Sequence, residues 1–505
     1  MSKRKRFIIN GLLLSIVGLA VRAVSMMFNA YITRTVGAEG IGLFTLIMTV
    51  YSFAITFATS GISLTVTRLV AAAIGDNDEG RIRSIMRHAV AYALIFSSFA
   101  TVVLFAFSGY FASRVLSDLR TVLPLRILSL SLVPIAMLSV FGGYFVGVRR
   151  VAKNAVVQVL GQLFKISTTI FFVFKFLSLG AEYATIALCI STTVTEFASF
   201  CVSFLQYLLD KKRVLLAKKS AHFFNVAEVA LPLAVSAYIR SSLLTLEHVL
   251  IPKRLRDSGM THSASIASYG ILHGMTVPIL IFPMSPLSSF SGLLVPEFAE
   301  SMAEGNYSRM CRIASEAIKY TLVYSVAASV FIYIFAEEIG FAFYNSYDAG
   351  HFIALMAPVV PIMYLDHVTD SMLKGIGEQV YSMWVNISDS FLSVILIWFL
   401  IPIMGITGYA VVIVVMEAYN FLFSMIKLRG KIKFSFNLTG AILFPLFCAG
   451  FSAYLTQKLF IMGGSQSSGL WLFLKLAFAL AIFLALYTIP RVVKPTKAVK
   501  TQLKL

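Results

Sequence analysis

Charged residues are scarce in this sequence of 505 residues, at 13% of the total, whereas hydrophobic residues make up 58%. Soluble domains carry about 25% charged and about 45–50% apolar residues. A water-soluble fold would leave the apolar surplus exposed, so the composition excludes an ordinary soluble enzyme or binding domain. The connections between the hydrophobic stretches are also too short to fold as separate globular domains. We therefore expect an all-α integral membrane protein.

Cysteine is rare as well, with only four in the chain. Each lies inside or beside a hydrophobic stretch, and no pair has the spacing typical of a metal site or a disulfide. These residues are Cys189, Cys201, Cys311 and Cys448. We expect them to pack as small apolar side chains, with no metal site and no bound cofactor.

Hydrophobic stretches long enough to cross a bilayer recur along the whole chain, because a spanning helix needs about 20 apolar residues. The first follows a basic start, but it is too long for a signal peptide and is interrupted by Arg22 and Asn29. We predict about 14 transmembrane helices. They cover residues 7–31, 41–66, 86–108, 121–147, 154–177, 184–208, 225–250, 264–295, 313–335, 351–373, 380–403, 406–426, 440–460 and 469–489.

The net charge of +19 is concentrated in alternate connections between these stretches. Connections rich in Lys and Arg face the cytoplasm, so the charge distribution predicts that both termini are cytoplasmic. Basic residues at that face attract anionic lipid headgroups. Membrane lipids therefore account for the positive charge, and we expect no nucleic-acid partner.

The two halves of the sequence contain similar segments in the same order. Leu132-Val-Pro-Ile135 recurs as Val359-Val-Pro-Ile362, and the polar turn at 74–81 is echoed at 302–309. The pattern predicts two six-helix repeats that share one orientation, with substrate bound between them. The predicted boundaries are 1–209 for the first repeat, 210–224 for a basic linker, 225–430 for the second repeat, and 431–505 for a helical hairpin and basic tail.

Charges inside the predicted spans are the first candidates for function, since a charge at mid-bilayer costs about 2.5–3.5 kcal/mol on insertion scales. Arg22 and Asn29 lie on one face of the first span, and Arg240 and Glu247 lie on one face of the seventh. Two guanidinium groups suit a divalent anion such as a pyrophosphate, because each offers planar paired donors. The alternatives are a structural ion pair, with Glu247 neutralising Arg240, or snorkelling to the headgroups.

Lys165 in the fifth span and Glu196 in the sixth fall at nearly equal depth on adjacent antiparallel helices. They form a candidate pair that either binds substrate or holds two helices in register. Lys475 in the last span has no partner that the sequence identifies.

Four carboxylates in the second half are candidates for coupling transport to a cation, either Na⁺ or a proton. They are Asp366, Asp370, Asp389 and Glu417. For Asp366 and Asp370, which approach a helix end next to Lys374, a solvated helix end is the alternative.

The eighth span contains Pro278, Pro283 and Pro286 within nine residues. Proline removes a backbone donor and kinks a helix, and such breaks persist in membranes only where protein or water satisfies the freed carbonyls. We predict a flexible gate helix, with a static kink as the alternative.

Several short segments resemble the polysaccharide biosynthesis or stage V sporulation protein B family, within the superfamily of multidrug, oligosaccharidyl-lipid and polysaccharide flippases. The segments are Asn10-Gly11, Val21-Arg22, Thr35-Val-Gly-Ala-Glu-Gly-Ile-Gly42, Gly61-Ile-Ser63 and Thr67-Arg-Leu69. The resemblance implies a V-shaped bundle with a central cavity lined by Arg22, and a final hairpin that forms a groove for a polyprenyl tail. It also implies a bacterial cell membrane location.

The substrate that the resemblance implies is an undecaprenyl-pyrophosphate-linked sugar, flipped from the inner to the outer leaflet for peptidoglycan or spore cortex. Cell-wall synthesis proteins are candidate partners. One alternative is a cation-coupled drug exporter of the same superfamily, although the basic residues Arg22, Lys165 and Arg240 favour an anionic cargo. Another is a membrane-embedded polymerase of lipid-linked sugars. The outer connections offer few groups for a catalytic base, so we expect that the protein is not an enzyme.

Overall fold

The structure is a computed structural model that describes residues 3–59, 61–75, 79–148, 150–210, 223–433, 438–462 and 469–493. Side chains are described from residue 24 on and, after the gap that follows residue 210, from residue 234 on. The described residues form helices and their connections, with no β-strand among them. The all-α prediction is therefore confirmed.

The helices fall into two compact units. Unit 1 comprises Met1–Gly270 and Val394–Gly405, and unit 2 comprises Ile271–Ser393 and Ile406–Leu505. The sequence-based boundaries at 209, 224 and 430 concern the predicted repeats and stay a prediction, because the units are defined by contacts rather than by repetition.

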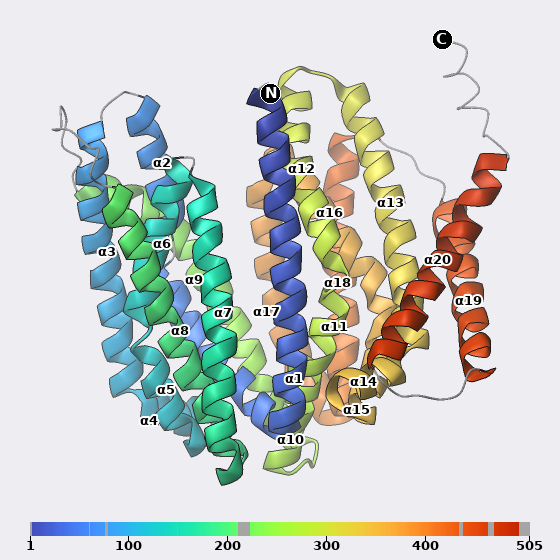
Figure 1. Ribbon diagram of the computed structural model, residues 1–505, viewed down its shortest axis with the longest axis horizontal. Helices are drawn as coiled ribbons and strands as arrows, with labels where there is room; N and C mark the ends of the chain where they lie inside the picture. The colour runs from blue at the N-terminus through green and yellow to red at the C-terminus, as the bar shows by residue number, and fades with distance from the viewer. Residues whose placement is uncertain are drawn as a thin grey trace. The chain divides into compact units, whose positions relative to one another are not determined.

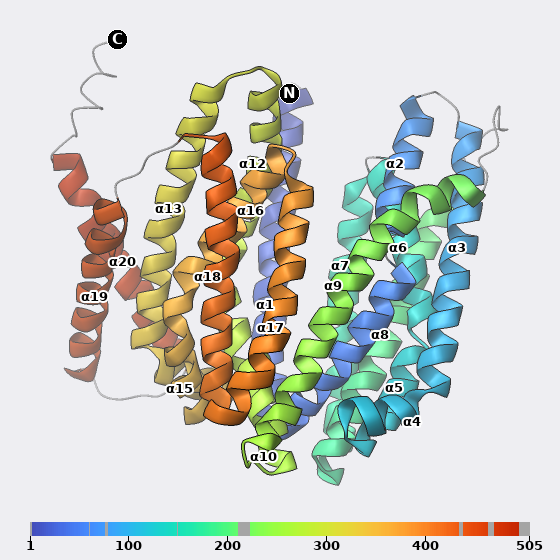
Figure 2. The same cartoon turned by 180° about the vertical axis from the view of Figure 1, so that it is seen from behind.

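The helices of unit 1 can be followed by their labels in the two opposite views of Figure 1 and Figure 2. Its helices are α1 (Lys3–Thr59), α2 (Ile62–Gly75), α3 (Glu79–Ala106), α4 (Ser108–Tyr110), the π-helix η1 (Phe111–Leu116), the 3₁₀ turn η2 (Leu119–Thr121), α5 (Val122–Ser129), α6 (Leu132–Gly147), α7 (Val151–Phe176), η3 (Leu177–Leu179), α8 (Ala181–Asp210), α9 (Phe223–Asp257) and α10 (His262–Gly270).

Unit 2 has its own set of helices, of which α17 also contributes its last part to unit 1. They are the π-helix η5 (Ile271–Thr276), α11 (Val277–Ile281), α12 (Met284–Ala303), α13 (Tyr307–Ile334), α14 (Ala336–Tyr344), α15 (Tyr347–Met356), η6 (Ala357–Val359), α16 (Val360–Gly375), α17 (Gln379–Met404), α18 (Ile406–Lys431), α19 (Leu438–Met462) and α20 (Gly469–Val493).

The helix α1 contains a sharp bend at Gly37, whose φ of 85° lies in the region that only glycine adopts freely. Residues beyond the bend pack against α10 in unit 1, where Gly42 and Gly270 face each other. A side chain at Gly42 would overlap the backbone carbonyl of Ile266. The two glycines therefore permit a close helix crossing, as small residues do in membranes.

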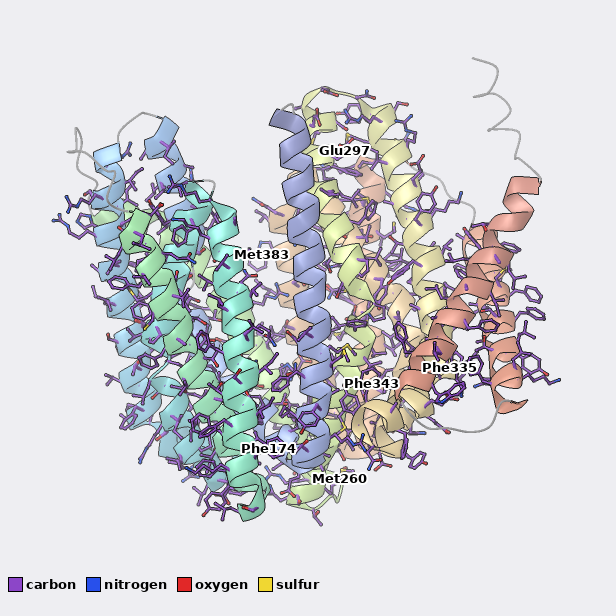
Figure 3. All side chains as sticks on the ribbon, viewed as in Figure 1. Phe174, Met260, Glu297, Phe335, Phe343 and Met383 are labelled. Carbon is purple, nitrogen blue, oxygen red and sulfur yellow. The ribbon has the colours of Figure 1, made fainter. Side chains whose placement is uncertain are left out.

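Apolar side chains both fill each unit and cover its surface. In unit 2, Phe298, Leu322 and Leu428 belong to one buried cluster drawn from α12, α13, α16, α18 and α19. On the surface of unit 1, Phe174 on α7 is 60% exposed, and Figure 3 labels it. Exposed aromatic groups of this kind are stable in lipid rather than in water.

Of the described helices, 11 are long and apolar enough to cross a membrane, or up to 12 if the bent pair Leu119–Ser129 and Leu132–Gly147 is one span. The difference from 14 has two sources. The first two predicted spans lie on two helices that meet at the kink of α1, and only the part from Val24 on is among the eleven. The helix α9, whose side chains are described only from residue 234 on, is not among them. The multi-pass prediction is confirmed, and the number 14 stays a prediction.

In each unit, ion pairs join the ends of two consecutive long helices. The acidic residue lies on the second helix in unit 1 and at the start of the first helix in unit 2. In unit 1, Asp210 at the end of α8 binds Lys153 at the start of α7, at 2.7 Å. In unit 2, Glu378 at the start of α17 binds Lys427 and Lys431 at the end of α18, at 3.2 and 3.0 Å. Both pairs join the fifth and sixth helices of a predicted repeat, which is an observation in favour of the repeat.

The close crossing of α1 and α10 generates a stability prediction. We expect Gly42→Ala to lower the free energy of unfolding by about 1–3 kcal/mol, because a backbone carbonyl cannot move aside as a flexible side chain can. The measurement is thermal unfolding of the detergent-solubilised protein. Gly450→Ala on α19, where an added Cβ meets nothing within 4 Å, is the control. Equal melting temperatures for both variants would contradict the crossing.

Candidate functional site

The predicted anion site at the first span falls on α1, but the side chain of Arg22 lies outside the described residues. Asn29, further along the same helix, is exposed. The role of Arg22 and Asn29 in substrate binding therefore stays a prediction.

The second candidate arginine, Arg240, is exposed on α9, and Glu247 is half-buried two turns further along that helix. This part of α9 is fastened to α1 by hydrogen bonds. Tyr238 donates to the carbonyl of Phe57 at 3.1 Å, and the rings of these two residues stack with centroids 5.1 Å apart. Glu247 lies close enough to Tyr269 of α10 to interact electrostatically. These contacts hold α9 against α1, and the Arg240 side chain remains exposed.

The candidate pair Lys165 and Glu196 lies between α7 and α8, which pack along their lengths in unit 1. The two charges are half-buried and interact electrostatically, although their charged atoms are not within the 4 Å of a direct ion pair. Hydroxyl groups of the same two helices bond beside them, with Thr169 and Ser191 2.6 Å apart. The structure thus brings together two charges that the sequence placed at equal depth, in a polar layer inside an apolar helix pair.

Three of the four candidate coupling carboxylates come from three different helices of unit 2 and lie near one another. Asp366 on α16 interacts electrostatically with Asp389 on α17, and Glu417 on α18 interacts with both. The fourth, Asp370, also interacts electrostatically with Asp366 and forms an ion pair with Lys374 at 2.6 Å. Like charges in a low-dielectric setting repel, so this trio favours the binding of protons or a cation.

The predicted eighth span is interrupted once, at Phe282 and Pro283. We expected one kinked helix over 264–295; instead α10, η5, α11 and α12 follow one another, and the chain turns at Phe282 and Pro283. The break falls at Pro283, as the proline spacing leads one to expect, because proline removes a backbone donor.

Tyrosine hydroxyl groups supply hydrogen bonds at this break. Tyr364 of α16 donates to the carbonyl of Leu280 at 2.7 Å, and Tyr324 of α13 donates to that of Pro283 at 2.6 Å. The protein itself therefore satisfies the carbonyls that a helix interruption in a membrane exposes. Whether the break also acts as a gate stays a prediction.

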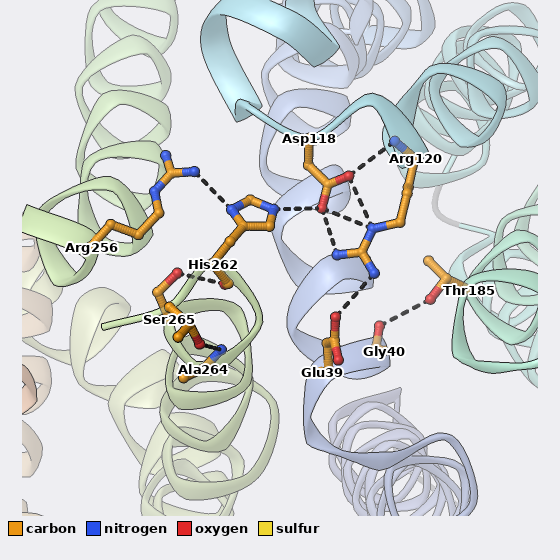
Figure 4. Close-up of polar contacts among 10 residues, drawn as sticks. Glu39, Gly40, Asp118, Arg120, Thr185, Arg256, His262, Ala264 and Ser265 are labelled. Atoms are coloured by element: carbon orange, nitrogen blue, oxygen red, sulfur yellow. Dashed lines mark hydrogen bonds and ion pairs between the residues drawn. The ribbon is translucent and has the colours of Figure 1, made fainter. Parts of the chain in front are cut away.

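A charged cluster in the connections of unit 1 was missed by the sequence reasoning (Figure 4). Arg120 of η2 binds Asp118 at 2.7 Å and Glu39 of α1 at 3.0 Å. His262 at the start of α10 also contacts Asp118, at 3.1 Å, and its other ring nitrogen contacts Arg256 at 2.7 Å. Burial opposes ionisation of Asp118, but the hydrogen bonds from Arg120 and His262 hold its pKa below the ordinary range.

The sequence contained one signal for this cluster. Glu39, Asp118 and His262 lie in three connections that the charge distribution assigns to the same side of the membrane, and opposite charges there can meet.

The partner of Lys475, which the sequence did not identify, is Glu338 of α14, at 3.0 Å. This ion pair joins α20 to α14 within unit 2. Within the described residues, no group of three or more His, Cys, Asp or Glu side chains is arranged to hold a metal ion.

The polysaccharide biosynthesis protein family model matches residues 7–302, and the MatE family model matches residues 258–400. The first match covers more than half of the chain. The chain belongs to the polysaccharide biosynthesis protein family.

Two proteins of Bacillus subtilis (strain 168) resemble the chain over most of its length. Stage V sporulation protein B of Bacillus subtilis (strain 168) is 26% identical over 420 residues, which are 81% of this chain and 81% of that protein. The lipid II flippase MurJ of the same organism is 22% identical over 454 residues, which are 83% of this chain and 81% of the flippase.

Solved structures share the fold. A lipid II flippase MurJ in an inward closed conformation matches with a TM-score of 0.71 at 12% identity, over 96% of this chain and 100% of that structure. An inward-facing multidrug resistance MATE family transporter of the MOP superfamily matches with a TM-score of 0.66 at 17% identity, over 82% and 98%. The family member described here is therefore a multi-pass membrane protein with the fold that these flippase and transporter structures share.

The helix break of this family member generates a second stability prediction. We expect Tyr364→Phe to lower the free energy of unfolding by about 1–3 kcal/mol, because the buried carbonyl of Leu280 loses its donor. Thermal unfolding in detergent measures the effect. Tyr333→Phe is the control, since Tyr333 is 57% exposed on α13. An unchanged melting temperature for Tyr364→Phe would mean that the hydroxyl group does not stabilise the break.

Proposed function

We propose that this protein flips an undecaprenyl-pyrophosphate-linked sugar precursor, for peptidoglycan or spore cortex, from the inner to the outer leaflet. The observation that supports this most is the extent of the likeness. The MurJ fold corresponds to 96% of this chain and the MATE fold to 82%, so the likeness to the flippase extends over more of the chain. The relatives over most of the sequence are a lipid II flippase and a sporulation protein.

The C-terminal hairpin suits a lipid tail. Phe447 on α19 and Phe473 on α20 are 69% and 67% exposed, so the hairpin offers apolar surface outside the core of unit 2. It is held to that unit by the ion pair of Lys475 with Glu338 and by an edge-to-face contact of Phe483 with Phe331. We infer that the polyprenyl chain stays against this hairpin while the headgroup crosses.

The headgroup would be bound by arginine. A pyrophosphate is best recognised by planar paired donors, and Arg22 and Arg240 are our candidates, with Asn29 and Glu247 beside them on the same helix faces. Alternating exposure of this site to the two leaflets would carry the substrate across without a covalent step. The protein then acts as a transporter rather than an enzyme.

The carboxylate trio Asp366, Asp389 and Glu417 would couple the cycle to a cation. Neutralising their mutual repulsion with protons or Na⁺ stabilises one arrangement of α16, α17 and α18 over another. A drug exporter of the same superfamily is the second candidate, because the MatE family match covers residues 258–400, which include Asp366 and Asp389.

Arg22→Ala tests the headgroup site. We expect translocation of a fluorescent undecaprenyl-pyrophosphate sugar in proteoliposomes to fall at least about 30-fold, since losing a charge-assisted paired contact costs about 2 kcal/mol or more. Arg34→Ala is the matched control, because it removes the same charge from an exposed position on α1. We expect it to retain the rate.

Two outcomes of that assay would contradict the proposal. Normal translocation by Arg22→Ala would remove the arginine from the mechanism. Growth of sugar chains without translocation, assayed in the same samples, would identify a polymerase instead.

Asp366→Asn and Glu417→Gln test the coupling. We expect each to lose at least about tenfold of the rate increase that an imposed proton or Na⁺ gradient produces in the wild type, equal to about 1.4 kcal/mol. Glu316→Gln, which removes an exposed carboxylate from α13, should respond as the wild type does. Imposing each gradient separately identifies the ion, and unchanged coupling in both carboxylate variants would exclude the trio as the coupling site.

A further inference from the structure

The contacts of His262 define which of its ring nitrogens carries the proton. A guanidinium N–H can only donate, so Nδ1 of His262, 2.7 Å from the Arg256 guanidinium, must accept. The carboxylate of Asp118 can only accept, so Nε2 at 3.1 Å must carry the hydrogen. The imidazole is therefore neutral in this arrangement and links α9 to η2 through α10 (Figure 4).

The charges around this imidazole come from three elements besides α10. The α1 bend contributes Glu39, the connection at η2 contributes Asp118 and Arg120, and the end of α9 contributes Arg256. Nearby on α9, Arg254 is engaged separately, by Asp257 at 2.6 Å and by the ring of Trp398. With His262 neutral, the four charges nearest to it are two positive and two negative.

One added proton changes only one of the two links. It must bind Nδ1, which removes the acceptor of the Arg256 bond and places two cations 2.7 Å apart. The bond from Nε2 to Asp118 remains and becomes an ion pair, which is stronger than a neutral hydrogen bond.

We propose that His262 is a proton-binding site at which protonation releases Arg256 and detaches the end of α9 from the start of α10, while α10 stays bound to η2. The ligand is the proton, taken up from water on the side of the membrane that the charge distribution assigns to the outside. Neither the candidate headgroup residues nor the carboxylate trio contributes to this site.

The surroundings of His262 allow this change. Its side chain is 39% exposed, so protons reach it from water. Asp118, whose pKa lies below its ordinary range, stays ionised at the mildly acidic pH at which histidine ordinarily titrates. The connection between α9 and α10 turns at Gly259, whose φ is 99°, and Met260 is half-buried beside it, as labelled in Figure 3. Loss of the Arg256 bond would loosen this turn.

The contacts that join Asp118 to α1 do not depend on His262. Arg120 bonds Asp118 and Glu39 directly, and Thr185 of α8 donates to the carbonyl of Gly40 at 3.1 Å. Protonation therefore loosens the α9–α10 turn but leaves the α1 bend fastened, and a label at Gly40 would not respond.

The first test is the tautomer and titration of His262 by ¹⁵N NMR of the full chain in lipid nanodiscs, with His262→Gln identifying its signals. We expect the Nε2–H tautomer at pH 8 and one protonation step in mild acid. Arg256→Gln should change the pH at which that step occurs, because it removes the adjacent cation. An Nδ1–H tautomer at pH 8, or a midpoint that Arg256→Gln leaves unchanged, would overturn the proposal.

The second test measures the turn itself, with a nitroxide label on Met260→Cys in a chain whose four native cysteines are replaced. We expect label mobility to rise as the pH falls from 8 to 5.5. His262→Gln can keep both hydrogen bonds but cannot titrate, so it should abolish the rise, whereas His351→Gln, which replaces an exposed histidine of α15, should not. Mobility independent of pH in the wild type, or the same rise in His262→Gln, would show that His262 does not control the turn. Neither test requires transport, so their outcome is separate from that of the proposed function.

Discussion

Every backbone polar group inside lipid needs a hydrogen-bond partner from the protein, and the form of this molecule follows from that constraint. It accounts for an all-helical chain, and it limits where a helix can be interrupted. The break between α11 and α12 occurs where Tyr364 and Tyr324 can donate to exposed carbonyls. At the bend of α1, Gly37 provides the backbone conformation and Thr185 bonds the carbonyl of Gly40.

The same cost applies to charged side chains, and several of those described lie in groups. Lys165 and Glu196 share a polar layer between α7 and α8, and Asp366, Asp389 and Glu417 meet among α16, α17 and α18. Ion pairs at helix ends, such as Asp210 with Lys153, bind neighbouring helices to each other. Unit 1 thus holds a charge pair and unit 2 an acidic trio.

Much of this fold could be predicted from the sequence, because span length and apolar composition are local properties. The prolines at 278, 283 and 286 predicted an interruption. They did not predict that α11 and α12 would be separate helices, because that depends on donors from α13 and α16. The partner of Lys475 and the cluster around Asp118 join residues far apart in the chain, and no local pattern identifies such pairs. A residue-by-residue comparison of the two predicted repeats also misses the pairs Asp210 with Lys153 and Glu378 with Lys427, because their charges are exchanged.

The cargo distinguishes the proposed flippase from the alternative drug exporter: an anionic lipid-linked sugar for the first, an organic cation for the second. The most direct test supplies wild-type proteoliposomes with a fluorescent undecaprenyl-pyrophosphate sugar and, separately, with a fluorescent organic cation. Access of each headgroup to a quencher on the opposite side is then followed over time. Translocation of the lipid-linked anion without movement of the cation is the result we predict. Movement of the cation alone would contradict it and would make the protein an exporter.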